Sequence, residues 1–183
     1  MNIIVRPYGK DSCYCRPDTT WERENRDLYS PDCVNEWYWA PVMFARVSKA
    51  GKCINPKFAE RYYDSVNFGI LLYAGNSEIA FSSCTDHTSI LPAPLYNPVV
   101  MENEENMFEV FKQGETIFRT GTAHRGLLED SICRASQMTS LRIGDMVAIE
   151  LSHISLLADR SEGEIRLEAS YCENSLSDFR IIF

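Results

Sequence analysis

The stretch FEVFKQGETIFRTGTAHRGLLEDSICRASQMTSLRIGD, residues 108–145, carries the patterns that decide the fold. Apolar and polar residues alternate on either side of Gln113-Gly114, which predicts a β-hairpin over 107–121. Apolar residues then recur three and four positions apart, after acidic residues in the first turn, and predict a helix over 125–137. A turn and an apolar strand follow over 141–151. The segment therefore indicates a mostly β protein with a minor helical part.

Neighbouring stretches extend the β pattern along the chain. The run WYWAPVMFARV, 37–47, predicts a strand at a sheet edge or with a bulge, because Pro41 lacks the amide hydrogen that a sheet ladder uses. Residues 6–36 are rich in Pro, Asp, Asn and Arg and predict a long irregular segment. The proline-rich residues 91–98 predict an extended connection. Further strands are predicted over 1–5, 66–74, 78–82, 165–170 and 179–183.

The composition is that of an ordinary globular domain, with 183 residues, 45% apolar content and 24% charged content. No stretch approaches the roughly 18 consecutive apolar residues that suggest a membrane span, and the start MNIIVRPYGK lacks the apolar run of a secretory signal. We therefore expect a single cytoplasmic domain over 1–183 with no membrane partner. The net charge of -8 and the scattered positions of the 18 Lys and Arg residues argue against nucleic acid as a partner.

The cysteines fit neither a disulfide framework nor a zinc site. Their number is odd, no CxxC pair is present, and no histidine cluster accompanies them. We expect reduced and mostly buried thiols. Cys13 and Cys15 flank Tyr14 in a polar segment, so a redox or metal role remains open for this pair.

Several segments, in this order along the chain, resemble the fumarylacetoacetate hydrolase superfamily, especially its short bacterial members. The first is GKCINPKFAERYYDSVNFGI, 51–70, and the last is LSDFRI, 176–181. Between them, residues 108–145 are similar to the family's hairpin, its short helix ending in a serine, and its Leu-x-x-Gly-Asp turn. In this chain these features are Gln113-Gly114-Glu115, Ser136 and Leu141-Arg142-Ile143-Gly144-Asp145. The resemblance implies a mixed β-sandwich or β-roll.

The resemblance also implies a metal-dependent chemistry that this sequence lacks. Family enzymes bind magnesium, manganese or calcium with a Glu-x-Glu pair on one strand and an aspartate on another. Side chains two apart on a strand share a face, so both carboxylates reach one ion, and such hard cations require oxygen ligands. Here the pair falls on Ala40 and Val42 and the aspartate on Leu71. A one-residue shift would bring Glu36, Asp64 or Asn67 closer without restoring three ligands.

Other catalytic motifs of the family are missing as well. The family's His-x-x-Glu pair near the N-terminus activates water, whereas no histidine of this chain precedes His87. The family's Ala-Arg-Asp is replaced by Ala74-Gly75-Asn76, and its Thr-Gly-Thr-Pro loop by approximately Ile149-Glu150-Leu151-Ser152. The sequence therefore favours a pseudoenzyme without metal ligands or cofactor.

Two functions remain open under this resemblance, and a third interpretation sets it aside. The first is a non-catalytic binding or interaction protein, a homodimer or a partner of an active relative, with a small acidic ligand. The alternative is a metal-dependent hydrolase, decarboxylase or isomerase of small 2-oxo or acylpyruvate-type acids. It would use Mg or Mn on relocated ligands drawn from Asp86, His87, Asp145 and Glu150. The third is an unrelated β-rich domain.

A few polar and aromatic residues remain candidates for function. Asp86 and His87, in SSCTDHTS, are the candidate catalytic residues, although a surface loop that caps its own turns explains them equally simply. His124 and His153 are expected to be surface or structural residues. The run Trp37-Tyr38-Trp39 predicts either an interface anchor or core packing.

Overall fold

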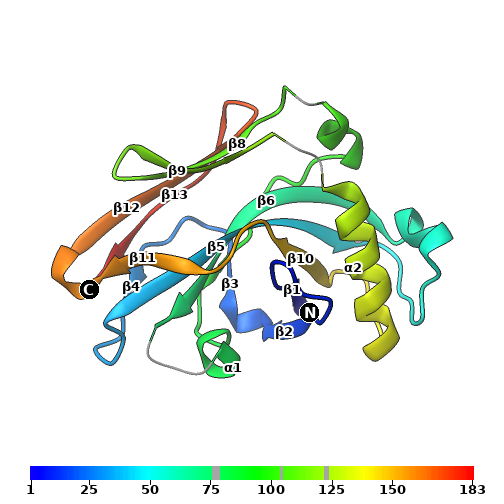
Figure 1. Ribbon diagram of the computed structural model, residues 1–183, viewed down its shortest axis with the longest axis horizontal. Helices are drawn as coiled ribbons and strands as arrows, with labels where there is room; N and C mark the ends of the chain where they lie inside the picture. The colour runs from blue at the N-terminus through cyan, green and yellow to red at the C-terminus, as the bar shows by residue number, and fades with distance from the viewer. Residues whose placement is uncertain (76–78, 104, 122–123) are drawn as a thin grey trace.

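The computed structural model describes residues 1–75, 79–103, 105–121 and 124–183. Within these residues the chain forms two β-sheets, with α2 (Arg125–Met138) packed beside the larger one (Figure 1). The larger sheet has the strand order β2-β1-β10-β5-β6-β7-β3, and β11 also pairs with β5. Its strands are β1 (Asn2–Arg6), β2 (Tyr14–Pro17), β3 (Trp21–Glu22), β5 (Glu36–Val47), β6 (Tyr63–Ala74), β7 (Ser89–Ile90), β10 (Met146–Glu150) and β11 (Ser155–Asp159).

The smaller sheet has the order β4-β13-β12-β8-β9 and lies across one face of the larger sheet (Figure 1). Its strands are β4 (Leu28–Tyr29), β8 (Phe108–Lys112), β9 (Glu115–Thr120), β12 (Glu164–Tyr171) and β13 (Asn174–Ile182). The described residues also form short helices: α1 (Ile79–Ser82), η1 (Asp18–Thr20), η2 (Pro56–Arg61), η3 (Pro98–Glu102) and η4 (Arg160–Glu162). None of the helices in the described ranges has the length and apolar character needed to span a membrane. This architecture confirms the mostly β fold class predicted from the sequence.

The two long strands β5 and β6 are buried on both faces. Odd-numbered residues of β5, such as Trp37 and Met43, belong to the main core, which lies between the sheets and beneath α2. Even-numbered residues, such as Ala40 and Phe44, belong to a second apolar cluster on the opposite face of the sheet. Because neither face meets solvent, β5 shows no alternation of polar and apolar residues. The same division holds for β6, where Leu71 faces the second cluster.

Pro41 lies in a strand with neighbours on both sides, so the expectation of an edge strand was wrong. β5 pairs with β6 along its length, and on its other side with β10 and then with β11. The Pro41 carbonyl accepts a hydrogen bond from the Leu151 N–H at 2.8 Å, on the side where β10 ends and β11 has not begun. The nitrogen of a strand residue points to the same side as its carbonyl. The nitrogen of Pro41 therefore faces the gap between β10 and β11. No strand residue there needs an amide donor from β5, so a proline is tolerated.

The strands, hairpin and helix with a clear period were predicted correctly. The predicted hairpin over 107–121 is β8 and β9, and the predicted helix over 125–137 is α2. The strand predicted over 78–82 was wrong, because Ile79–Ser82 is a helical turn; Glu78 lies outside the described residues. A short apolar run alone does not distinguish a strand from a helix. Residues 6–36, expected to be irregular, contain the short strands β2, β3 and β4.

Asp145 ties the N-terminal strand to β10. Its side chain is 1% exposed, Oδ1 accepts a hydrogen bond from the Asn2 N–H, and Oδ2 accepts one from the Arg142 N–H, each at 2.8 Å. Gly144, just before it, has φ +90°, a conformation that suits glycine. The Gly-Asp turn is therefore a structural element, and Asp145 is fully engaged in it.

Replacing Asp145 with alanine is expected to lower the free energy of unfolding by about 2–3 kcal/mol, because two partly buried amides lose a charged acceptor. Urea denaturation followed by circular dichroism measures this change. Asp64→Ala is the matched control, since Asp64 is exposed and accepts a hydrogen bond from the neighbouring Ser65 hydroxyl. Equal stability of the two variants would contradict this role for Asp145.

Candidate functional site

The three positions that the sequence resemblance assigns to the family's metal ligands lie together inside the larger sheet. Ala40 on β5 and Leu71 on β6 are directly opposite each other, and Val42 lies two residues beyond Ala40. All three side chains are 0% exposed and belong to the same apolar cluster. Gly69 faces Val42 across the strands, and a Cβ atom there would lie 2.4 Å from the Ile90 carbonyl oxygen, so the strands approach closely.

These residues do not fit a divalent ion. Alanine, valine and leucine side chains carry no oxygen, and magnesium or manganese requires oxygen ligands. Elsewhere in the described residues, no group of three or more His, Cys, Asp or Glu side chains is arranged to hold a metal. Filling the former ligand positions with apolar side chains removes the cost of burying carboxylates without their ion.

A buried polar network lies beside this apolar cluster. Glu150 on β10 is opposite Val42, and Tyr73 follows Leu71 by two residues on β6, so both side chains face the same interior. The Tyr73 hydroxyl donates to Glu150 Oε1 at 2.6 Å, and the Tyr8 N–H donates to Oε2 at 3.0 Å. The Tyr14 hydroxyl lies 2.7 Å from the Tyr73 hydroxyl. The carboxylate therefore ends a chain of hydrogen bonds that begins on β2.

Arg16 brings a positive charge into the same interior. Its side chain is 0% exposed, and its guanidinium carbon lies 5.0 Å from the centre of the Tyr73 ring. Nη2 donates to the Leu72 carbonyl at 3.0 Å and to Thr88 Oγ1 at 2.6 Å. Nε and Nη1 have no hydrogen-bond partner among the described residues. Buried N–H groups of a charged side chain are costly without an acceptor, so this arrangement is suited to an anion.

Burial sets the protonation of the network. Burial raises the pKa of Glu150, and the Tyr73 hydrogen bond, the Tyr8 N–H and the Arg16 charge oppose this shift. Burial also raises the pKa of Tyr14 to about 12 and that of Tyr73 well above its usual value. Both phenols thus stay protonated near neutral pH. Glu150 is the group of this network that gains or loses a proton most readily.

The raised pKa of Glu150 makes a contribution to stability that depends on pH. In the folded chain the carboxyl binds its proton more tightly than in the unfolded chain, so the contribution is full below the unfolded pKa, near 4.5. It is lost as the pH rises through the higher folded pKa. In urea denaturation series, the stability of wild type relative to Glu150→Gln is therefore expected to fall between pH 4.5 and the folded pKa. Parallel stability curves for the two proteins would contradict this assignment.

The two candidate catalytic residues from the sequence lie elsewhere. Asp86 and His87 line a surface pocket with Tyr29 and Pro31, and no residue of the Glu150 network lines it. His87 has φ +59°, and its Nδ1 lies 3.0 Å from Glu22 Oε2. A catalytic role for Asp86 and His87 stays a prediction.

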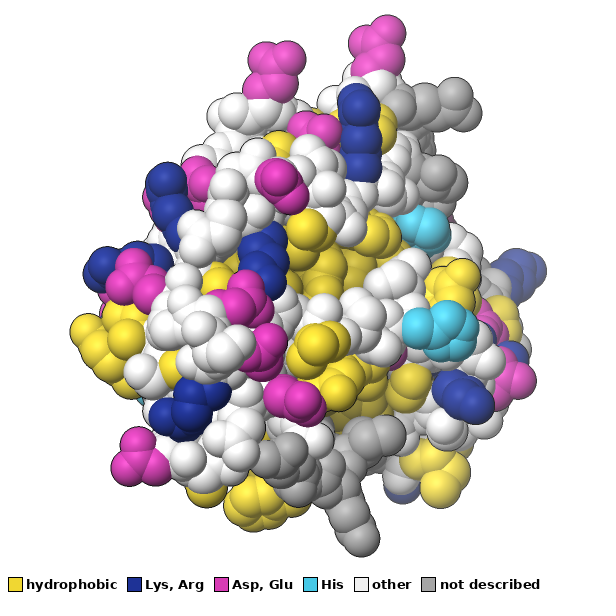
Figure 2. Space-filling view, turned by 60° about the vertical axis from the view of Figure 1, so that its left-hand side comes forward, with side chains coloured by type: hydrophobic (Ala, Val, Ile, Leu, Met, Phe, Trp, Pro, Cys, Tyr) yellow, Lys and Arg dark blue, Asp and Glu magenta, His cyan; other side chains and the backbone are white. Residues whose placement is uncertain are grey.

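Acidic and basic side chains are interspersed on the face of the molecule that Figure 2 shows.

The remaining candidates divide between structural positions and the network. Trp37 and Trp39 are buried in the main core, which favours core packing over an interface for these two rings. His124 is the residue before α2, and burial lowers its pKa. His153 packs its ring edge to face with Tyr8, with 4.7 Å between ring centres. The sequence pointed to Glu150 but not to Tyr14, Arg16 or Tyr73. The one feature of the sequence that could have indicated Tyr14 and Arg16 is their alternation about Cys15, which is typical of a strand.

Comparison with known proteins finds similar architectures among solved structures. No family model matches the sequence, and no curated protein sequence matches it. The fold is that of the fumarylacetoacetate hydrolase superfamily, as the sequence resemblance predicted.

Three solved structures illustrate the match. Fumarylpyruvate hydrolase from Pseudomonas aeruginosa, in complex with Mn2+ and pyruvate, has a TM-score of 0.80 at 13% identity, covering 100% of this chain and 90% of that one. A Yersinia pestis protein assigned to the fumarylacetoacetate hydrolase family gives 0.77 at 10% identity, covering 99% and 92%. The 5-carboxymethyl-2-hydroxymuconate delta-isomerase from Mycobacterium smegmatis gives 0.78 at 10% identity, covering 99% and 78%.

Proposed function

We propose that this chain is an enzyme of small 2-oxo acids that transfers a proton with Glu150 and holds the substrate anion on Arg16, without a divalent ion. The observation that carries the proposal is the fully buried Arg16, whose Nε and Nη1 have no partner among the described residues, next to the Glu150 network. The similar solved structures support the substrate class, because they include a hydrolase bound to pyruvate and an isomerase.

The proposed chemistry is the isomerisation of an oxo acid through its enolate. A base removes the proton from the carbon beside the carbonyl, and a positive group stabilises the negative oxygen that forms. Glu150 is the base, and it returns the proton to the enolate oxygen or, where a carbon–carbon double bond is conjugated with the enolate, to the far carbon of the dienolate. The Arg16 guanidinium is the positive group. The Tyr73 hydroxyl keeps the carboxylate in place at 2.6 Å. Hydrolysis through a metal-bound water is less suited to this site, because the side chains of Ala40, Val42 and Leu71 offer an ion no oxygen ligand.

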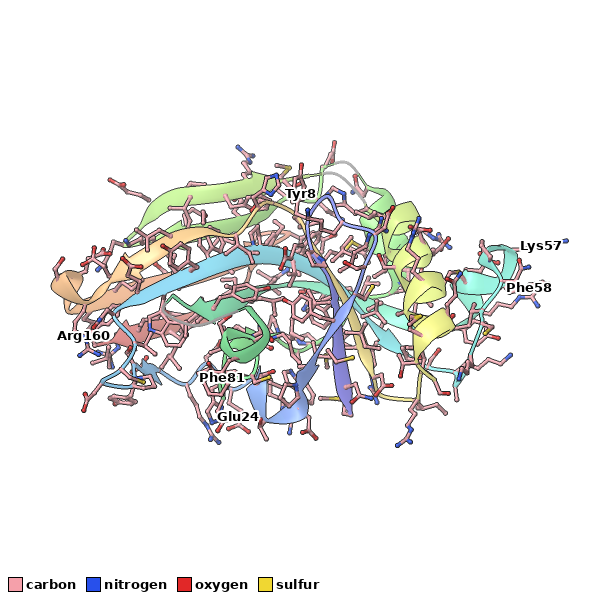
Figure 3. The ribbon with its side chains drawn as sticks, turned by 60° about the horizontal axis from the view of Figure 1, so that its bottom comes forward. Tyr8, Glu24, Lys57, Phe58, Phe81 and Arg160 are labelled. Carbon is pink, nitrogen blue, oxygen red and sulfur yellow. The ribbon has the colours of Figure 1, made fainter. Side chains whose placement is uncertain are left out.

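Substrate access requires the connection between β1 and β2 to move. Residues 7–13 form this connection, and the Tyr8 N–H donates to Glu150 Oε2. The Tyr8 side chain is 43% exposed and packs on the His153 ring. Figure 3 labels Tyr8 on the loop between β1 and β2. In this proposal the loop covers Glu150 in the free protein and uncovers it for the substrate.

A second candidate is a non-catalytic protein that binds a small acid or a partner, including a second copy of the chain. The packed apolar side chains of Ala40, Val42 and Leu71 favour this candidate. They offer no ligand to a metal ion, and they keep the interior of the sheet closely packed. In this case Arg16 would hold the acid without turnover.

Deuterium exchange distinguishes these functions. The purified protein is incubated with pyruvate, oxaloacetate or an acylpyruvate in deuterated buffer, with and without EDTA, and exchange at the carbon beside the carbonyl is followed by NMR. We expect accelerated exchange that EDTA leaves unchanged. Binding without exchange would support the non-catalytic candidate, and loss of exchange in EDTA would support relocated metal ligands. Absence of both binding and exchange would overturn the proposal.

A further inference from the structure

Sulfur-bearing side chains gather between β2 and the last turns of α2, away from the Glu150 network. Tyr14 and Arg16 face the sheet interior, so Cys15, which lies between them on β2, faces the opposite side. Cys13 lies one residue before the strand and lines the same pocket as Cys15. Cys15 is paired with Ile4, which belongs to the main core on the same side as α2. The two thiols are therefore on the helix side of the strand.

The two thiols share a pocket with a thioether. Cys13, Cys15 and Met138 line one cavity of about 410 Å³, together with Asp11 and Arg134. Both cysteines are free thiols, and the Met138 side chain is 89% exposed. Three sulfur side chains thus line one open site, and the function proposed above gives no chemical role to any of the three sulfur atoms, although Cys13 ends the connection between β1 and β2.

We propose that this sulfur pocket, formed by Cys13, Cys15 and Met138, binds Cu(I). Soft thiolate and thioether ligands select this ion, and the pocket offers it two thiolates and one thioether. Zinc prefers four ligands, commonly with imidazole, and no histidine lines the pocket. Cysteines two apart on a strand have Cα atoms roughly 6.6 Å apart, which is at the upper end of the disulfide range, whereas one ion bridges such a pair easily.

The side chains around the pocket include two arginines that can accompany an anionic complex of Cu(I) with two thiolates. When the ion binds, each thiol loses its proton to solvent, so two thiolates and one Cu(I) leave a net charge of about -1. Burial raises the pKa of both thiols, and the charges of Arg6 and Arg134 oppose this shift at Cys13. Asp11 accepts from Arg6 Nη2 at 3.0 Å and lies 3.6 Å from Arg134 Nη2, so it holds both cations beside the pocket.

Competition for Cu(I) tests the site. The full chain is loaded with Cu(I) without oxygen in the presence of bicinchoninate, a chromophoric chelator, and the copper retained by the protein is measured. We expect wild type to retain one copper ion per chain, and Cys13→Ser and Cys15→Ser each to lose it to the chelator. Met138→Leu, a change at an exposed position, is expected to retain less copper than wild type. X-ray absorption of the loaded protein is expected to show sulfur neighbours alone.

Cys53→Ser is the matched control, because Cys53 is another exposed free thiol that does not line the pocket. It is expected to retain copper as wild type does. The proposal is overturned if Cys13→Ser and Cys15→Ser retain copper, or if Cys53→Ser loses it equally. Formation of a Cys13–Cys15 disulfide in place of copper binding would overturn it as well.

Discussion

Replacing Leu71 with aspartate is expected to lower the free energy of unfolding by about 3–5 kcal/mol, the cost of an unpaired buried charge. Leu71 is 0% exposed and lies opposite Ala40 within an apolar cluster inside the larger sheet. Here the carboxylate of Glu150 on the same face already accepts hydrogen bonds from the Tyr73 hydroxyl and the Tyr8 N–H. The new carboxylate at position 71 must therefore take up a proton or destabilise the fold.

Urea denaturation at neutral pH, with and without added Mn2+, measures this effect. Leu156→Asp is the control, since Leu156 on β11 is 52% exposed and a charge there stays hydrated. Mn2+ is expected to restore no stability to Leu71→Asp, because Ala40 and Val42 offer it no oxygen. A Leu71→Asp protein as stable as the Leu156→Asp control would contradict the packed interior described above.

Replacing Glu150 with glutamine is expected to reduce proton exchange on 2-oxo acids by at least about 100-fold, the lower end of what a positioned general base contributes. Glutamine keeps the shape of the side chain and an acceptor for the Tyr73 hydroxyl, but it cannot take a proton. Binding of the acid is expected to change little, because in this account Arg16 holds the anion. The rate of wild type is also expected to rise with pH through the raised pKa of Glu150, and this rise is lost in the variant.

Glu36→Gln is the matched control for this experiment. The Tyr38 hydroxyl donates to Glu36 Oε2 at 3.3 Å, so this residue is also a glutamate held by a tyrosine, but outside the Glu150 network. Its replacement is expected to leave the exchange rate and its pH profile unchanged. An unchanged rate in Glu150→Gln, or an equal loss in Glu36→Gln, would show that Glu150 is not the base.

The fold was predictable where a segment's own residues decide its structure. The hairpin around Gln113-Gly114, the helix over 125–137 and the two long strands have periods or runs that few other structures satisfy. The short strands within 6–36 were not predictable, because each is defined by its partner strand. For example, β3 has two residues and pairs with β7, and β4 has two residues and pairs with β13.

The sequence predicted which three apolar residues lie together inside the sheet, but not the polar network beside them. The spacing of two residues on one strand and the position of the third ligand were enough to place Ala40, Val42 and Leu71 together. Arg16 and Tyr73 gave no comparable signal, because an arginine in a polar segment and a tyrosine in an apolar strand are ordinary. Their meeting depends on the curvature of the larger sheet, which brings β2 beside β6 across the interior.

Crystals soaked in MnCl2 and measured for the anomalous scattering of manganese test the central claim most directly. The account predicts no manganese peak between the side chains of Ala40, Val42 and Leu71, and continuous density for a packed apolar interior. A peak inside the larger sheet, bonded to three protein oxygen atoms, would contradict it.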